Sequence, residues 1–533
     1  MNSIHTLAVV PIVINAGAAA LPAIIAGIAS VAAILFKPRA LAQLLRKRML
    51  ASSVLFLALI SCCALAAFWW RSPTVRRTAN ANRINWTKIA EDIIAQDRVR
   101  NLSDPSAQPA ANSPASPGAA LAVSAPSPTG ARDFSRTLYL GGPSPVGLNP
   151  LWSYKPESTV FFGIPAIVGK RIFAAGCQSD LGGYTGILTC LDLDTGKSLW
   201  ETTDIGNDAL RPFFSSPAVS TDGKFVVIGQ GLHQDKDCSL LCFDAATGKQ
   251  VWAVKTPLHV ESSPAIFGDL AVVGAGAIEG ENGKPVGDPG FVLAVRVSDG
   301  KMLWKQSVND PESSPAIDEN GMVYIGSGCN GQAVVAIRSE SDEQLQQKKL
   351  ERIVWRTEVA VPMLAPITLA SNMVIAAGGN GDMVHSGRNP QGLVAALDRR
   401  TGKILWQTTL PDAVLGGIAS RDGMLICPAR NGEVYALALG DGHILWQARI
   451  SGTAPVLTGC AITSDRAYAV SNDGYLVALA TADGKALEKV YLNDQGKPGS
   501  GLSLSSPQVI NNRIIVGTET GGLRCLQGTG GGK

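Results

Sequence analysis

This sequence lacks an excess of charge of either sign. Only 17% of its 533 residues are charged, and 46 Lys and Arg stand against 43 Asp and Glu, which gives a formal net charge of +3. A chain that binds nucleic acid through its phosphates, or that carries an acidic tail, usually shows a marked imbalance. The composition therefore indicates no nucleic-acid partner.

Cysteines are also too few for a disulfide scaffold, since the whole chain has ten. Gly and Pro, by contrast, are abundant at 57 and 31 residues, which favours many turns over long helices. The length exceeds what one ordinary hydrophobic core holds. We therefore expect a repeat or multi-domain architecture that is rich in turns.

The N-terminal region differs from the rest, because it contains two long uncharged runs. Residues 7–36 and 49–70 each reach the roughly 20 residues that a helix needs to cross a bilayer. We predict a two-helix membrane anchor over residues 1–72. The loop between the helices carries five Lys and Arg and the segment before them carries none, so the positive-inside rule places the loop in the cytoplasm. The remaining chain then faces the periplasm or exterior of a cytoplasmic (inner) membrane.

Two features of this region leave alternatives open. Four arginines follow the second run and favour the reverse orientation. Leu59 to Cys62 resemble a bacterial lipobox, which would make Cys62 a lipidated N-terminus. The apolar run continues past Cys62 to Trp70, which favours a helix instead. Anchoring by two helices and anchoring by a lipid leave the downstream chain on the same side.

A connecting region follows the anchor. Residues 73–101 form a juxtamembrane segment, in which a short helix is expected over 86–99 because three isoleucines share one helical face. Residues 102–133 are mainly Pro, Ser and Ala, with too few large apolar side chains to bury, so we predict a disordered linker.

Self-similarity with a period of 40 to 52 residues dominates residues 134–527. Each copy reads as an apolar strand, Asp, a turn with Gly-Lys and a strand that ends in Trp, as in CLDLDTGKSLW ending at Trp200. The Gly suits a positive φ, and the Trp is expected to fill the gap to the next unit. Asp194-Thr195-Gly196 resembles an aspartic-protease triplet, but Thr-Gly recurs at this point of the repeat and indicates a turn. The structural tryptophans are Trp152, Trp200, Trp252, Trp304, Trp355, Trp406 and Trp446.

Two further strands precede each motif, and four-stranded units at this spacing are the blades of a propeller. An eighth anchor position holds Glu488 in place of Trp. Trp152 has no strands before it, whereas the last unit has three strands and no Trp, so an N-terminal strand is expected to complete the last blade. The fold class is therefore an all-β, eight-bladed β-propeller with N-terminal strand closure, preceded by two transmembrane helices and a disordered linker. Residues 528–533 form a flexible tail.

These blades resemble those of the eight-bladed quinoprotein-like propellers, also called PQQ-repeat propellers, which share the Ala, Asp, Thr-Gly-Lys and Trp signature. The resemblance covers residues 145–527 and implies the fold. The group includes pyrroloquinoline quinone dehydrogenases and non-catalytic BamB-like assembly factors of the outer membrane. In the dehydrogenases the resemblance implies a Trp floor under the cofactor, a bound calcium, a catalytic Asp and an adjacent Cys pair. The adjacent pair of this chain, Cys62 and Cys63, lies in the second apolar run, so we predict no catalytic residue and no cofactor.

The other cysteines have a simpler interpretation. Cys190, Cys242 and Cys525 occupy the repeat position where other copies have Ala, which indicates small core residues with free thiols. Cys177 and Cys190 flank one hairpin and are an alternative disulfide pair. No Cys or His cluster has the spacing of metal ligands, so the sequence predicts no metal site.

Candidate binding residues fall in loops that a propeller places at one end of its channel. Several loops between second and third strands are long, and charged residues precede the repeated Ser-Ser-Pro of successive blades. A solvated rim is the alternative interpretation. The insertion 339–352 is expected to be a charged, helical protrusion at the opposite end. The candidate binding rim consists of Arg211, His233, His259, Glu261, Asp310, Glu312, Asp382 and His385.

A complete fold signature without a matching catalytic set favours a non-catalytic binding scaffold or sensor, presented outside the cytoplasm. Its partner would be an unidentified protein or envelope ligand, and envelope protein assembly is one such role. The alternative is a membrane-bound quinoprotein dehydrogenase, which would require pyrroloquinoline quinone and calcium.

Overall fold

The computed structural model describes residues 138–180, 183–206, 208–233, 235–278, 285–381, 383, 385–452, 454–494 and 504–530. The predicted membrane anchor, juxtamembrane helix and linker all lie outside these residues. Within the described part of the chain, no helix is long and apolar enough to span a membrane.

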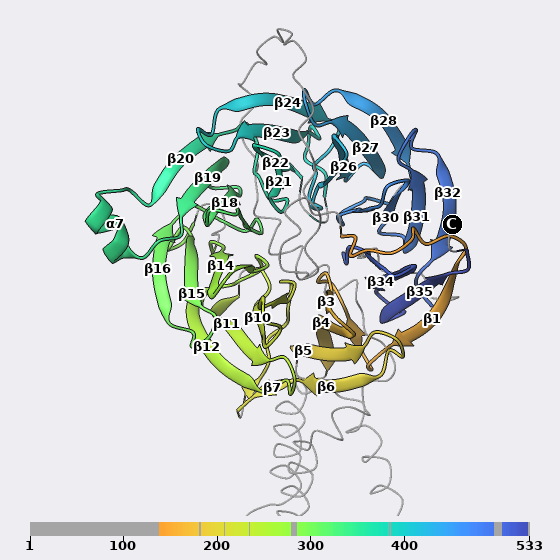
Figure 1. Cartoon of the computed structure of the whole chain (residues 1–533), viewed down its shortest axis with the longest axis horizontal. Coiled ribbons are helices and arrows are strands. Elements are labelled where there is room, and N and C mark those ends of the chain that lie inside the picture. The colour runs from red at the N-terminus through yellow and green to blue at the C-terminus, as the bar shows by residue number, and fades with distance from the viewer. Residues whose placement is uncertain are drawn as a thin grey trace, which may run out of the picture. The chain divides into compact units, whose positions relative to one another are not determined.

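The described chain forms an eight-bladed β-propeller, as the repeat predicts (Figure 1). Seven blades are antiparallel four-stranded sheets, and the first blade carries one extra short strand. The first four blades consist of β2 (Thr159–Val160), β3 (Ala166–Val168), β4 (Arg171–Asp180), β5 (Gly183–Asp192) and β6 (Ser198–Thr202); β9 (Ala218–Val219), β10 (Phe225–Gly229), β11 (Lys236–Asp244) and β12 (Gln250–Leu258); β13 (Ala265–Phe267), β14 (Leu270–Ala275), β15 (Phe291–Arg296) and β16 (Met302–Ser307); and β17 (Ala316–Ile317), β18 (Met322–Ser327), β19 (Ala333–Arg338) and β20 (Ile353–Glu358).

The remaining blades repeat the same order of strands from the channel outward. A small hairpin, β7 (Asp204–Ile205) and β8 (Asp208–Ala209), lies between the first two blades in the sequence. Blades five to eight consist of β21 (Thr368–Ala370), β22 (Met373–Gly379), β23 (Gly392–Asp398) and β24 (Ile404–Leu410); β25 (Ala419–Arg421), β26 (Met424–Ala429), β27 (Glu433–Ala438) and β28 (Ile444–Arg449); β29 (Ala461–Ile462), β30 (Arg466–Val470), β31 (Tyr475–Ala480) and β32 (Ala486–Tyr491); and β33 (Gln508–Ile510), β34 (Arg513–Gly517), β35 (Leu523–Gly528) and β1 (Leu148–Tyr154).

The ring closes as expected, with the N-terminal strand β1 completing the last blade. β1 pairs antiparallel with β35, and Trp152 lies opposite Cys525. The two ends of the propeller therefore share one sheet (Figure 1). Pairing with β1 covers the edge of β35, which would otherwise be open to pairing with another chain.

Each Asp-x-x-Thr-Gly motif is a turn, which confirms that the protease-like triplet is structural. The Thr195 N–H and hydroxyl both donate to Asp192 Oδ1, at 2.8 and 2.7 Å, and the Gly196 N–H donates to the Asp192 carbonyl at 2.8 Å. Gly196 has φ +66°, a region that Gly adopts without a steric penalty. The carboxylate thus satisfies backbone groups that a tight turn would otherwise expose.

The tryptophans join neighbouring blades, as predicted. Each indole N–H donates to a backbone carbonyl of the following blade; for example, Trp252 Nε1 is 2.7 Å from the Val297 oxygen. The ring also covers the Gly of the next turn, since a Cβ on Gly300 would lie 2.7 Å from the Trp252 ring. The same hydrogen bond recurs from Trp152, Trp200, Trp304, Trp355, Trp406 and Trp446, at 2.8 to 3.1 Å.

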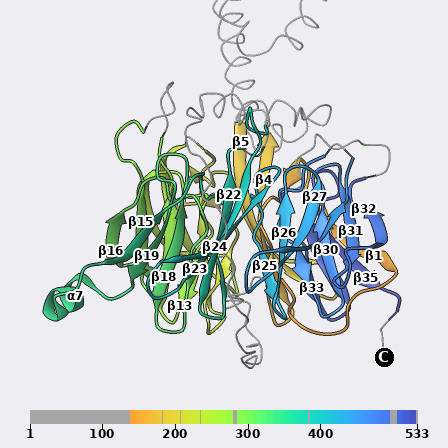
Figure 2. The same cartoon turned by 90° about the horizontal axis from the view of Figure 1, so that it is seen from above.

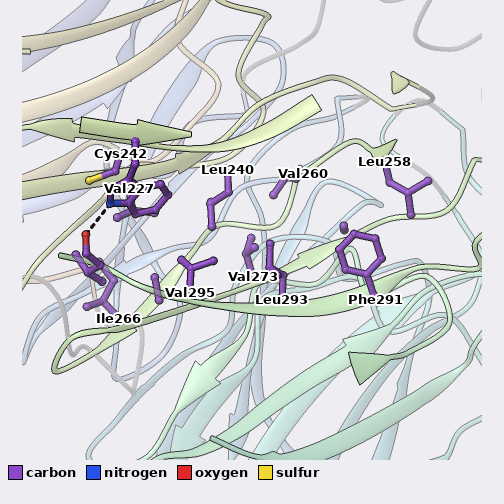
Figure 3. Packing of buried hydrophobic residues seen from close by; sticks show 14 of the residues in the cluster. Val227, Leu240, Cys242, Leu258, Val260, Ile266, Val273, Phe291, Leu293 and Val295 are labelled. Atoms are coloured by element: carbon purple, nitrogen blue, oxygen red, sulfur yellow. Dashed lines mark hydrogen bonds between the residues drawn. The ribbon is translucent and has the colours of Figure 1, made fainter. Parts of the chain in front are cut away.

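Between the blades lie buried apolar clusters, one of which Figure 3 shows between the second and third blades. Val227 and Leu240 of the second blade face Val273 and Leu293 of the third, and all four are buried. The sequences of these strands are continuous apolar runs because both faces of each sheet are buried. Burial of this surface holds the blades in a ring.

The cysteines behave as small core residues. Cys190, Cys242 and Cys525 lie directly opposite Trp200, Trp252 and Trp152, in the position that other blades fill with Ala. The eight cysteines of the described residues are free, so Cys177 and Cys190 are not paired. Burial raises the pKa of the Cys190 thiol to about 11 and that of Cys177 to about 12, which keeps both protonated at neutral pH.

The insertion 339–352 contains a helix, α7 (Asp342–Lys348), as expected from its composition. Ser341 caps its N-terminus in a capping box with Gln344. The helix joins β19 to β20, on the end of the propeller away from the tip of the β4–β5 hairpin (Figure 2). Arg352 then returns to the junction, with its guanidinium 4.6 Å from the centre of the Trp304 ring.

Candidate functional site

The Ser-Ser-Pro segments make hydrogen bonds between neighbouring blades beside the channel, from the second blade to the fifth and from the eighth to the first. The Ser215 hydroxyl donates to the Ser262 carbonyl at 3.1 Å, and the Ser262 hydroxyl donates to the Ser313 carbonyl at 3.0 Å. Ser313 continues to Ala365, and Ser505 reaches Gly163 of the first blade. These hydrogen bonds therefore fix the position of one connection between blades relative to the next.

A central cavity of about 180 Å³ lies beside these segments. Its lining is mainly apolar, with side chains such as Phe162, Phe214 and Leu457. Three residues of the predicted rim, His233, Glu261 and Glu312, also line it. Ionisable groups are thus confined to one arc of the wall, which the second, third and fourth blades form.

That arc holds a cluster of His233, His259, Glu261 and Glu312, which we term the His/Glu cluster. One potential ligand atom of each residue lies within 4.8 Å of those of the others. Glu312 Oε1 lies 3.2 Å from His233 Nδ1 and 3.3 Å from His259 Nε2, and the imidazole rings meet edge to face. His233 and His259 are buried, and Glu261 and Glu312 are partly buried.

The backbone positions these four side chains from three different connections. His233 lies between β10 and β11, His259 and Glu261 follow β12, and Glu312 precedes β17. Gly276 leaves room for the contact, because a Cβ there would lie 2.5 Å from His259 Nε2 and 2.8 Å from Glu312 Oε1. The cluster thus depends on a glycine that contributes no functional group of its own.

Arg211, Asp310 and His385 of the predicted rim do not join this cluster. Arg211 donates from Nη1 to the Lys236 carbonyl at 2.8 Å. Asp310 is fully buried with φ +50°, and its backbone bonds to Pro289 and Gly328, so it shapes a connection rather than a solvated rim. His385 is exposed in the loop between β22 and β23. Asp382 lies outside the described residues.

The prediction that no metal ligands gather rested on local spacing, which is the wrong criterion here. His233 and His259 are 26 positions apart, and Glu312 is 53 positions beyond His259. Metal sites with short spacing are built within one loop or helix. A propeller instead brings together residues from different connections, and Glu261 and Glu312 lie about one repeat apart. The cluster is therefore visible only once the blades are in register.

The cavity does not fit pyrroloquinoline quinone. A quinone stacked over a Trp floor needs an indole in the cavity wall, but the seven tryptophans of the described residues all bond to neighbouring blades through the outer strands. The side chains that line the cavity include no Trp. The acidic groups share their arc with two imidazoles, whereas calcium prefers an all-oxygen set.

Fold and blade signature together define a PQQ-repeat propeller. A family model described as outer membrane protein assembly factor BamB matches residues 149–353 and 390–533. The chain therefore belongs to the BamB-like family of PQQ-repeat propellers.

Individual relatives are distant. The chain is 24% identical to the outer membrane protein assembly factor BamB of Yersinia pestis over 67% of this chain and 82% of that protein. A quinohemoprotein alcohol dehydrogenase of Comamonas testosteroni is 28% identical, but over 36% of this chain and 27% of the enzyme. The crystal structure of BamB from Moraxella catarrhalis superposes with a TM-score of 0.53 at 16% identity, covering 71% of this chain and 99% of that chain. This last likeness concerns the fold alone.

Proposed function

We propose that this chain is a non-catalytic binding scaffold that acts in the assembly of envelope proteins. The observation that carries the proposal is the use of tryptophan: each Trp of the described blades closes a junction between blades, and none lines the central cavity. The Yersinia pestis relative, which spans most of the propeller, is an outer membrane assembly factor. Likeness of fold alone does not assign a function, whereas the family and the lining of the cavity both favour a non-catalytic role.

The proposed placement is the extracytoplasmic side of the cytoplasmic membrane. Its support is the pair of uncharged runs at 7–36 and 49–70 and the basic loop between them. A Pro-, Ser- and Ala-rich linker at 102–133 would give the propeller reach from the membrane. Reporter fusions after residue 133 that are active only in the cytoplasm would contradict this orientation.

The proposed docking end is the one that carries the long loops between second and third strands. Propellers commonly present recognition on such loops, which a rigid ring of sheets holds in place. Arg388 is exposed on one of these loops, and Lys236 is exposed at the first residue of β11, where another of them ends. Glu343 is exposed on α7 at the opposite end.

Site-specific photocrosslinking in cells tests the proposal. A photoreactive residue at Lys236 or Arg388 of the full chain should yield crosslinks to proteins of outer-membrane assembly, and the same residue at Glu343 should not. Loss of the chain should also lower the amount of folded outer-membrane proteins. Equal crosslinking from both ends with unchanged outer-membrane proteins would contradict the scaffold, and dye reduction by protein loaded with pyrroloquinoline quinone and calcium would favour the dehydrogenase.

A further inference from the structure

We propose that the His/Glu cluster is a structural site for a divalent first-row transition metal ion of the zinc type, which cross-links the second, third and fourth blades at the channel wall. Imidazole nitrogens and carboxylate oxygens are ligands that zinc accepts, and a set with two histidines disfavours the oxygen-seeking calcium and magnesium ions. The proposal is independent of the scaffold function.

The distances within the cluster suit such an ion. Zinc binds His nitrogen and carboxylate oxygen at about 2.0–2.1 Å, so neighbouring ligand atoms of a tetrahedral site lie about 3.3 Å apart. Glu312 Oε1 is already 3.2 and 3.3 Å from the two imidazole nitrogens. The four ligand atoms all lie within 4.8 Å of one another, so small side-chain rotations of the partly buried glutamates complete the tetrahedron.

Charge and burial favour the same conclusion. Two carboxyl groups and two imidazoles meet at this largely buried point, and a divalent cation is a partner that all four groups can share. His259 is fully buried, and its Nδ1 has no hydrogen-bond partner among the described residues. The other ring nitrogen, Nε2, points into the cluster at Glu312.

The number of ligands indicates a structural role. Catalytic zinc sites usually keep three protein ligands and one open position, whereas structural sites are closed by four. The His/Glu cluster offers four side chains from three connections between strands and blades. An ion there would link segments that are otherwise held together by the Ser-Ser-Pro hydrogen bonds and by apolar packing.

Cobalt(II) titration of the full chain, after removal of metal by a chelator, tests the site. We expect one equivalent of Co²⁺ to bind with the intense visible absorption of tetrahedral coordination, and Zn²⁺ to displace it. Zn²⁺ should also raise the Tm. Loss of second-shell partners lowers metal affinity about 10–100-fold, so loss of a ligand in His259→Gln or Glu312→Gln should lower it at least about 100-fold. Glu261→Gln, at a partly buried position, provides a variant with less risk to folding.

Two controls make the result decisive. His443→Gln removes an exposed imidazole that pairs with Asp441 on the sixth blade, and it should leave Co²⁺ binding unchanged. Gly276→Ala keeps all four ligands but intrudes between His259 and Glu312, so it should weaken binding at least about 10-fold. Absence of stoichiometric Co²⁺ binding, or binding that survives in all three ligand variants, would overturn the proposal and leave the cluster as a hydrogen-bonded network.

Discussion

The outer junctions of the propeller and the inner wall of its channel follow different rules. At the outer strands one solution recurs, in which a Trp of one blade bonds to the backbone of the next and covers the Gly of its turn. At the channel wall the Ser-Ser-Pro hydrogen bond recurs at several junctions, but the His/Glu cluster occurs on one arc. Repetition therefore accounts for the fold, and departure from repetition indicates where a specific function lies.

Two outer junctions also depart from the rule, and both departures have a structural explanation. At the insertion, Arg352 stacks on Trp304 where other junctions place a Gly turn. At the closing junction Glu488 replaces Trp, and its carboxylate accepts hydrogen bonds from the Gly147 and Leu148 N–H groups at 3.0 and 2.6 Å. The Glu488 carboxylate thus binds the start of β1, the N-terminal strand that completes the last blade.

The largest expected effect comes from removing an outer junction. Trp252→Ala should lower the free energy of unfolding by about 3–5 kcal/mol, because it deletes a buried ring and the hydrogen bond to Val297. Urea unfolding of the full chain measures the change. Val251→Ala is the matched control, since the neighbouring side chain is 45% exposed and should change stability by about 0.5 kcal/mol or less. Similar effects of the two variants would refute the role given to the tryptophan.

A smaller effect should come from the glycine under that ring. Gly300→Ala should cost about 2–4 kcal/mol, because the new Cβ meets the Trp252 ring at 2.7 Å and the residue has φ +72°. Gly268→Ala has a similar φ of +60° but open space around the Cβ, so it should cost about 1–2 kcal/mol from backbone strain alone. The difference between the two in thermal unfolding isolates the contact with the ring. Equal losses of stability in the two variants would show that the positive φ, and not the contact with the Trp252 ring, is the reason for glycine at position 300.

These junctions explain why the sequence predicts the outer part of the fold so well. The Asp, Gly and Trp positions have local or repeated causes, and the repeat therefore predicts the eight blades, the closing strand and the free cysteines of the Ala slot. Interpretation of Asp310 as part of a solvated rim was wrong, because it is fully buried. The His/Glu cluster could not be recognised from spacing, since its members lie on three connections and meet through Gly276. A search for ionisable residues separated by about one repeat would have paired His259 and Glu261 with Glu312, but not with His233.

The closing junction should be less sensitive than the tryptophan junctions. Glu488→Ala leaves the Gly147 and Leu148 N–H groups without their acceptor, at a cost of about 1–3 kcal/mol. Amide hydrogen exchange should locate the loss at the start of β1. Glu488→Gln keeps a neutral acceptor and should lose less. Faster exchange spread evenly over all blades would contradict a local closing role.

The smallest effect should be a pH dependence in the exposed turns. Hydrogen bonds from the Thr195 hydroxyl and N–H hold the pKa of Asp192 below its usual value. A carboxyl with a lowered folded-state pKa stabilises the fold above its unfolded pKa of about 3.9, and this contribution disappears as the pH falls through the folded-state pKa. Because the turn is exposed and screened by solvent, Asp192→Asn should cost under about 1 kcal/mol at neutral pH. The difference from the wild-type chain in urea unfolding should shrink below about pH 4, and a difference that grew with acidification would show that the carboxylate does not stabilise the turn.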